Sequence, residues 1–116
     1  MSAVDYYTTP RGEQPGREWL VSLASDLRAV MFDKISRLEE HGLALLGTEM
    51  MKRVEGNDPD FYELRGGQGR ILLYYDRESG SFILLHGFRK QSRREEREID
   101  TGRRRLHRYL EERGIL

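Results

Sequence analysis

Four side chains at the ends of neighbouring predicted strands have the chemistry to act on a phosphate. Arg65 ends the first of these strands, and His86, Arg89 and Lys90 end the third. If short turns join the strands, these cations gather around one point with the histidine beside them. Positive charge stabilises a phosphorane, and an imidazole with a pKa near neutrality can transfer protons. The set therefore suits cleavage of an RNA phosphodiester without a metal ion.

Simpler interpretations of the same residues stay open. A single histidine near a sheet edge, such as His86, is often structural, and Arg65 has Glu63 and Glu98 as possible ion-pair partners. The chain has no cysteine, and its three histidines show no ligand-like spacing, so we expect no metal site.

Three strands of an antiparallel meander are predicted to position these residues. They cover 61–65, 70–75 and 81–88, with glycine-containing turns at 66–69 and 76–80. Alternation predicts three sets of side chains that share a face: Phe61, Glu63 and Arg65; Arg70, Leu72 and Tyr74; Phe82, Leu84, His86 and Phe88. We expect helices to cover one face of this sheet and the function to lie on the other, polar face.

The rest of the chain predicts the elements around the meander. A short strand over 4–9 precedes a helix that starts at Pro15 and a second helix from about residue 25 to Gly42. An irregular edge strand is expected near 52–53, and a capping box from Ser92 to Glu95 predicts a last helix. The predicted fold is α+β: a small antiparallel sheet, with the N-terminal strand and two-helix hairpin packed on one face and a C-terminal helix. Residues 1–116 are expected to form a single domain.

Charge is divided unevenly along a chain whose net charge is zero. Residues 1–64 carry a charge of −5 and residues 65–108 carry +6, and 17 of the 20 basic residues are arginine. Arginine binds phosphate with a planar fork, so a nucleic acid is the first partner to consider, although a solvated charged helix would give the same pattern. No apolar run predicts a membrane span or an export signal, and we expect a cytoplasmic protein.

Three segments resemble the central block of a known family. FYELR at 61–65, RILLYY at 70–75 and LHGFRK at 85–90 are similar to the phage-related HigB-like toxins of the RelE/ParE superfamily. Residues 38–42 and 97–106 also resemble the second and last helices of that family. The resemblance extends from about Val4 to Leu110 and implies a RelE-like fold.

The resemblance implies the toxin of a type II toxin–antitoxin pair, an mRNA interferase. Such a toxin is an endoribonuclease that needs no metal or cofactor, cuts mRNA on the ribosome and so inhibits translation. The cut leaves a 2′,3′-cyclic phosphate or a 3′-phosphate, and a 5′-hydroxyl. Arg65 and Lys90 then correspond to transition-state cations and His86 to the proton-transfer residue. The residues implied in RNA binding are Arg70, Arg89, Arg93 and Arg94.

The resemblance also implies partners and leaves other functions open. We expect a cognate antitoxin of the helix-turn-helix type that covers the basic face or wraps the helices, with operator DNA contacted only through that antitoxin. Some members of the superfamily instead inhibit DNA gyrase and cut nothing. A third alternative is an inactive toxin-like domain that acts as the antitoxin's partner in transcription.

Overall fold

The structure contains the predicted strands and helices in the predicted order. It is a computed structural model that describes residues 1–91 and 95–115. None of the helices it describes is long and apolar enough to cross a membrane. The elements are β1 (Ala3–Tyr6), α1 (Pro15–Ser22), α2 (Ser25–His41), a 3-10 turn η1 (Gly42–Leu45), β2 (Met51–Arg53), β3 (Phe61–Gly66), β4 (Gly69–Asp76), β5 (Ser81–Arg89) and α3 (Glu95–Glu112).

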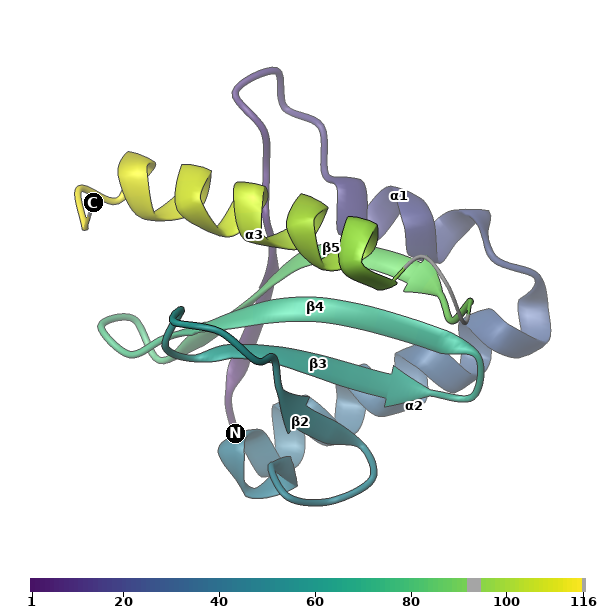
Figure 1. The fold of residues 1–116 in the computed structure, drawn as a ribbon. Helices are drawn as coiled ribbons and strands as arrows, with labels where there is room; N and C mark the ends of the chain where they lie inside the picture. The colour runs from purple at the N-terminus through teal and green to yellow at the C-terminus, as the bar shows by residue number, and fades with distance from the viewer. Residues whose placement is uncertain (92–94, 116) are drawn as a thin grey trace.

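Five strands form one sheet in the order β1-β5-β4-β3-β2 (Figure 1). β2, β3, β4 and β5 pair antiparallel, which confirms the meander, and β1 pairs with β5 in parallel. β1 reaches only to the Tyr6–Leu84 pair, so it covers the first half of β5. The ends of β3, β4 and β5 near Arg65 and Arg89 therefore lie away from the N-terminal strand.

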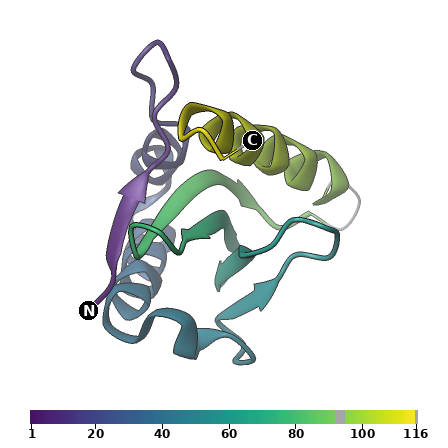
Figure 2. The same ribbon diagram turned by 90° about the vertical axis from the view of Figure 1, so that its left-hand side faces the viewer.

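Helices α1 and α2 cover one face of the sheet, as predicted (Figure 2). Met31, Ile35 and Leu38 recur at helical spacing along α2 and are buried against this face. The strands contribute the side chains of alternate positions. These are Tyr62, Leu64, Ile71, Leu73, Phe82 and Leu84.

The other face is not an open polar surface, because α3 packs across it (Figures 1 and 2). Leu106 and Leu110 of α3 are buried in a second apolar cluster. The strand residues of that cluster are Phe61, Leu72, Tyr74, Ile83, Leu85 and Phe88. The expectation that function occupies a polar sheet face is therefore wrong for most of the sheet. The polar part of this face is confined to the end of the sheet beyond the first turn of α3, where Arg65 and Arg70 lie.

A β-bulge in β5 changes which side chains share a face. Leu73 pairs with Leu84 and Leu72 pairs with His86, so Leu85 is an extra residue in β5. Phe82 and Leu84 therefore face α2, whereas His86 and Phe88 lie on the α3 side. The prediction that these four share one face is wrong. Strict alternation cannot reveal a bulge, and this bulge brings His86 to the same side as Arg65 and Arg70.

At Gly102, α3 packs closely against Leu72 of β4. A Cβ atom placed there would lie 2.5 Å from Leu72 Cδ1 and 3.2 Å from its Cβ. We therefore expect Gly102→Val to lower the free energy of unfolding by about 1–3 kcal/mol, the usual cost of overpacking a core. Urea denaturation measures this, with Glu96→Ala on the exposed side of α3 as control. Equal stability of the two variants would show that α3 does not pack tightly on Leu72.

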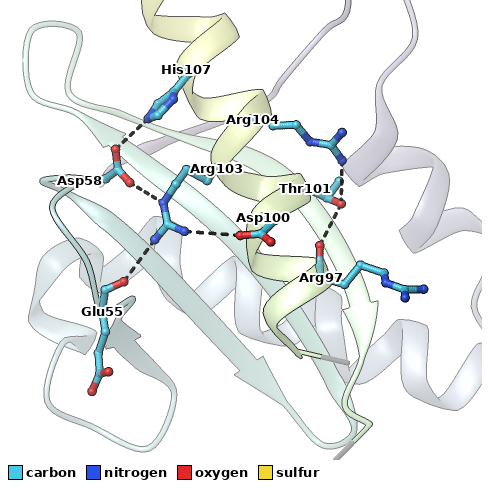
Figure 3. Close-up of polar contacts among 8 residues, drawn as sticks. All are labelled: Glu55, Asp58, Arg97, Asp100, Thr101, Arg103, Arg104 and His107. Carbon is cyan, nitrogen blue, oxygen red and sulfur yellow. Dashed lines mark hydrogen bonds and ion pairs between the residues drawn. The ribbon is translucent and has the colours of Figure 1, made fainter. Parts of the chain in front are cut away.

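Two aspartates outside α3 tie this helix to the sheet. Asp58 binds Arg103 Nε at 2.6 Å and His107 Nε2 at 2.9 Å (Figure 3). Asp76 accepts a hydrogen bond from the Tyr109 hydroxyl at 2.6 Å. Burial alone would raise the pKa of Asp58, but the hydrogen bonds and charges of His107 and Arg103 outweigh it and lower the pKa. These contacts hold α3 in one register over the second core.

Candidate functional site

Four of the predicted cations lie at the same end of the sheet, around the β3–β4 turn and the end of β5. Arg65 pairs with Arg70 across the β3–β4 turn, and Gly69 at the start of β4 pairs with Arg89. The Lys90 amide donates a hydrogen bond of 2.8 Å to the Gln68 carbonyl in the same turn. We call the set Arg65, Arg70, Arg89 and Lys90 the β3–β4 corner.

Glu63 anchors the two central arginines of this corner. Its carboxylate is 2 % exposed and accepts a hydrogen bond of 2.9 Å from Arg65 Nε. Arg70 Nε lies 3.9 Å from the same oxygen. Arg70 itself is buried, and its Nη1 donates to the carbonyls of Gly67 and Gly69 at 2.8 Å each. Arg70 therefore braces the turn, whereas Arg65 is the more accessible cation.

Arg65 lines an open cavity of about 430 Å³. Its side chain is 34 % exposed, and among the described residues only Glu63 pairs with its guanidinium, through Nε. The terminal nitrogens thus keep the fork that binds two oxygens of a phosphate. The cavity is lined by Lys34, Glu49, Met50, Arg65, Gly67 and Arg70.

Lys34 is a cation of this cavity that the sequence did not indicate. It lies on α2, and a Cβ atom at Gly66 would come within 2.9 Å of its Cγ. Because Gly66 at the end of β3 has no side chain, the aliphatic part of Lys34 can pass close to the backbone there. In the sequence Lys34 is one of several charged residues on the polar side of an amphipathic helix, which gives no signal of a site.

His86 lies on the same side of the sheet but under α3. Arg105 Nη1 is 2.7 Å from His86 Nδ1, and Glu98 Oε2 is 3.4 Å from Nε2. Because arginine can only donate, Nδ1 is the acceptor and the ring proton resides on Nε2. Burial and the charge of Arg105 lower the pKa of His86. Arg105 of α3 therefore occupies Nδ1, whereas Nε2 is buried beside Glu98 and has no hydrogen-bond partner within residues 1–91 and 95–115.

The other predicted cations belong to the end of β5 and to the segment that follows it. Arg89 and Lys90 are exposed at the end of β5, and among the described residues neither forms an ion pair. Arg89 lines a second cavity, of about 420 Å³, together with Trp19, Arg97 and Glu98. The predicted capping box from Ser92 and the predicted RNA contacts Arg93 and Arg94 lie outside the described residues. The backbone pairing thus places Arg65, Arg70, Arg89 and Lys90 at one end of the sheet, but Arg65 and Arg70 line one cavity and Arg89 lines another, while His86 is held under α3.

The environment of His86 predicts its titration. We expect the ring to titrate below its ordinary pKa of about 6.5, and Arg105→Gln to raise that pKa because a nearby cation is removed. In the wild type, stability should fall as the pH drops below about 6.5, since the unfolded chain then binds a proton that the folded ring does not. NMR titration of the ring measures both pKa values. An unchanged pKa in Arg105→Gln would contradict the assigned contact.

The comparisons with known proteins identify a family and a fold. The model of the family described as phage-derived protein Gp49-like (DUF891) matches residues 18–107. No curated protein sequence gives a significant match.

Three solved structures share the fold. The toxin–antitoxin complex RelBE2 from Mycobacterium tuberculosis has 18 % identity and a TM-score of 0.57, over 78 % of this chain and all (100 %) of that chain. The archaeal RelE–RelB complex from Pyrococcus horikoshii OT3 has 16 % identity and a TM-score of 0.57, over 79 % of this chain and 97 % of that one. A mutant of Escherichia coli toxin RelE in the free state has 17 % identity and a TM-score of 0.52, over 84 % and 94 %.

The predicted RelE-like fold is confirmed by these structures, and the family match accounts for most of the chain, including the β3–β4 corner. Assignment to the HigB-like branch stays a prediction. The chain belongs to the family of phage-derived Gp49-like proteins and has the fold of the RelE toxins.

Proposed function

We propose that this protein is the toxin of a type II toxin–antitoxin pair and that it cleaves messenger RNA bound to the ribosome. The observation that carries the proposal is the Glu63–Arg65 pair. It fixes Arg65 through Nε and leaves the terminal guanidinium nitrogens on an open cavity beside Lys34. A guanidinium held in this way is suited to a phosphate whose charge increases during the reaction.

The proposed reaction is an attack within the RNA chain. The 2′-oxygen loses its proton and bonds to the adjacent phosphorus, and the bond from phosphorus to the 5′-oxygen breaks as that oxygen gains a proton. The products are a 2′,3′-cyclic phosphate and a 5′-hydroxyl. Arg65 binds the non-bridging oxygens, and Lys90 and Lys34 add positive charge. Arg70 pairs with Arg65 across the β3–β4 turn and stabilises that turn through the carbonyls of Gly67 and Gly69. Arg89, Arg93 and Arg94 are the proposed contacts to the RNA strand.

His86 is the proposed proton-transfer residue, and its contacts set a condition for that role. Nδ1 accepts from Arg105, and Nε2 is buried beside Glu98 without a hydrogen-bond partner among the described residues, so the free protein exposes no ring nitrogen to a substrate. Arg105 must leave Nδ1 before the ring can accept a proton from a 2′-hydroxyl. Charge stabilisation by Arg65 needs no such rearrangement, so we expect a smaller loss of activity in His86→Ala than in Arg65→Ala.

We also infer a cognate antitoxin as partner. Two of the structures that share this fold contain a toxin with its antitoxin. The exposed cations Arg89 and Lys90 form a surface that an acidic segment of such a partner would neutralise. In this proposal the antitoxin masks the corner and also provides any contact with operator DNA.

Expression of the protein in a bacterial host tests this function against gyrase inhibition. The proposal predicts that incorporation of labelled amino acids falls soon after induction, while plasmid supercoiling is unchanged. Growth arrest with relaxed plasmid and continued translation would overturn it and favour the gyrase alternative.

A further inference from the structure

The arginines of α3 fall into two groups with different partners. Arg103 pairs with Asp58 and Asp100 (Figure 3), and Arg113 pairs with Asp76. Arg97 and Arg104 point away from Arg103 (Figure 3), and helical spacing places Arg105 and Arg108 on their side of the helix. Within residues 1–91 and 95–115, no carboxylate lies within ion-pair distance of these four side chains. Arg103 and Arg113 therefore hold the helix in place. The charges of the other four arginines are not neutralised by a carboxylate of the described residues.

Three of these arginines line a groove between α3 and the segment that follows β1. The groove has a volume of about 300 Å³ and is lined by Tyr7, Thr9, Pro10, Thr101, Arg104, Arg105 and Arg108. Arg104 donates to the Thr101 hydroxyl at 3.2 Å, and Arg105 donates to the Leu85 carbonyl at 3.2 Å. Burial and the nearby charge of Arg104 lower the pKa of Arg105, although an arginine stays charged. Arg105 is half-buried and Arg104 and Arg108 are exposed beside it, so three guanidinium groups with no carboxylate partner among the described residues converge on a site that favours an anion.

The spacing of the arginines fits an extended polyanion better than a single small ion. Along a helix, Arg97 lies about 10 Å from Arg104, and Arg104 about 6 Å from Arg108. Arg97 also lines the neighbouring cavity with Arg89. The cations therefore continue from the β3–β4 corner, past Arg97, into the groove.

We propose that the groove of Arg104, Arg105 and Arg108 binds the phosphodiester backbone of RNA beyond the nucleotide held at the β3–β4 corner. The inference rests on the proposed action on RNA and adds a second contact surface to it. Phosphate oxygens accept from the guanidinium groups, and the hydroxyl of Thr9, which accepts from the Glu13 amide, can donate to the same backbone. Arg105 connects this groove to His86, because it lines the groove and donates to Nδ1. A phosphate in the groove competes for that guanidinium and so releases the histidine.

Binding of an RNA that cannot be cut tests the groove separately from the nuclease activity. The probe is a short 2′-O-methyl RNA strand, and the readout is fluorescence anisotropy over a range of salt concentrations. The double variant Arg104→Glu/Arg108→Glu is compared with Arg37→Glu/Arg53→Glu, which changes the net charge equally at exposed positions on α2 and β2. We expect the groove variant to bind about 10- to 100-fold more weakly, with a shallower dependence on salt, and the control to bind nearly as the wild type does.

Two results would overturn the proposal, once urea denaturation shows that both variants fold with the stability of the wild type. One is equal RNA binding by the groove variant and the control, with binding to polyglutamate also unchanged, which would leave the groove without either ligand. The other is equal RNA binding together with loss of polyglutamate binding by the groove variant alone, which would assign the groove to an acidic protein segment. Because the probe has no free 2′-hydroxyl, failure of the cleavage reaction itself does not change either result.

Discussion

Replacement of Arg65 by alanine is expected to slow messenger cleavage by about 10²- to 10³-fold, the usual effect of removing one preorganised donor to a developing oxyanion. The side chain is held by a hydrogen bond of 2.9 Å to a buried carboxylate and is 34 % exposed on a cavity. The substitution also leaves the buried Glu63 carboxylate without the donor Arg65 Nε, so urea denaturation must show that the variant is folded under the assay conditions. Single-turnover cleavage of a message on translating ribosomes measures the effect.

Arg77 offers a matched control for this substitution. Like Arg65 it pairs through Nε with a carboxylate, that of Asp60 at 2.8 Å, but it follows β4 at the opposite end of that strand. Arg77→Ala should keep nearly full activity. Arg65→Lys, which keeps the charge but loses the planar fork, should fall between the two. Equal rates for Arg65→Ala and Arg77→Ala would remove Arg65 from the mechanism.

Replacement of Glu63 by alanine is expected to lower the free energy of unfolding by about 3–5 kcal/mol, as when one partner of a buried ion pair is removed. Glu63 is 2 % exposed and Arg70 is 7 % exposed, so the substitution leaves a buried cation near no carboxylate. Glu63→Gln keeps an oxygen that accepts from Arg65 Nε, so we expect a smaller loss of stability. Urea denaturation at pH 7 measures both variants.

The exposed Glu78 provides the control for the Glu63 variants, because Glu78→Ala should change the free energy of unfolding by no more than about 0.5 kcal/mol. If Glu63→Ala proved as stable as Glu78→Ala, the carboxylate would not be what holds the corner together. A folded Glu63→Ala that also cut RNA at the wild-type rate would show that Arg65 needs no anchor.

The order of elements was predictable because each has a strong local signal. The β3–β4 turn is rich in glycine, the strands alternate, and α2 shows apolar residues at helical spacing. The gathering of Arg65, Arg70, Arg89 and Lys90 follows from the pairing of strands that are neighbours in the sequence. These local features were therefore enough to predict that the four residues lie at one end of the sheet.

The parts that could not be predicted depend on tertiary packing. The bulge at Leu85 moves His86 to the other side of β5, and no residue type in that stretch signals it. The docking of α3 on the second face buries that face, occupies Nδ1 of His86 through Arg105 and buries Nε2 beside Glu98. Lys34 reaches the cavity from a distant helix, and its position depends on how α2 packs against the end of β3.

The most direct test of the central claim is the chemistry of the RNA ends made by the purified protein. The protein is added to ribosomes translating a defined message, in the presence of a chelator concentration that leaves the ribosomes intact, and the cut sites are mapped with enzymes specific for each end. The account predicts discrete cuts within codons that carry a 5′-hydroxyl and a 2′,3′-cyclic phosphate or 3′-phosphate. It also predicts that Arg65→Ala makes almost none. Ends with a 5′-phosphate, or wild-type cutting by Arg65→Ala, would contradict it.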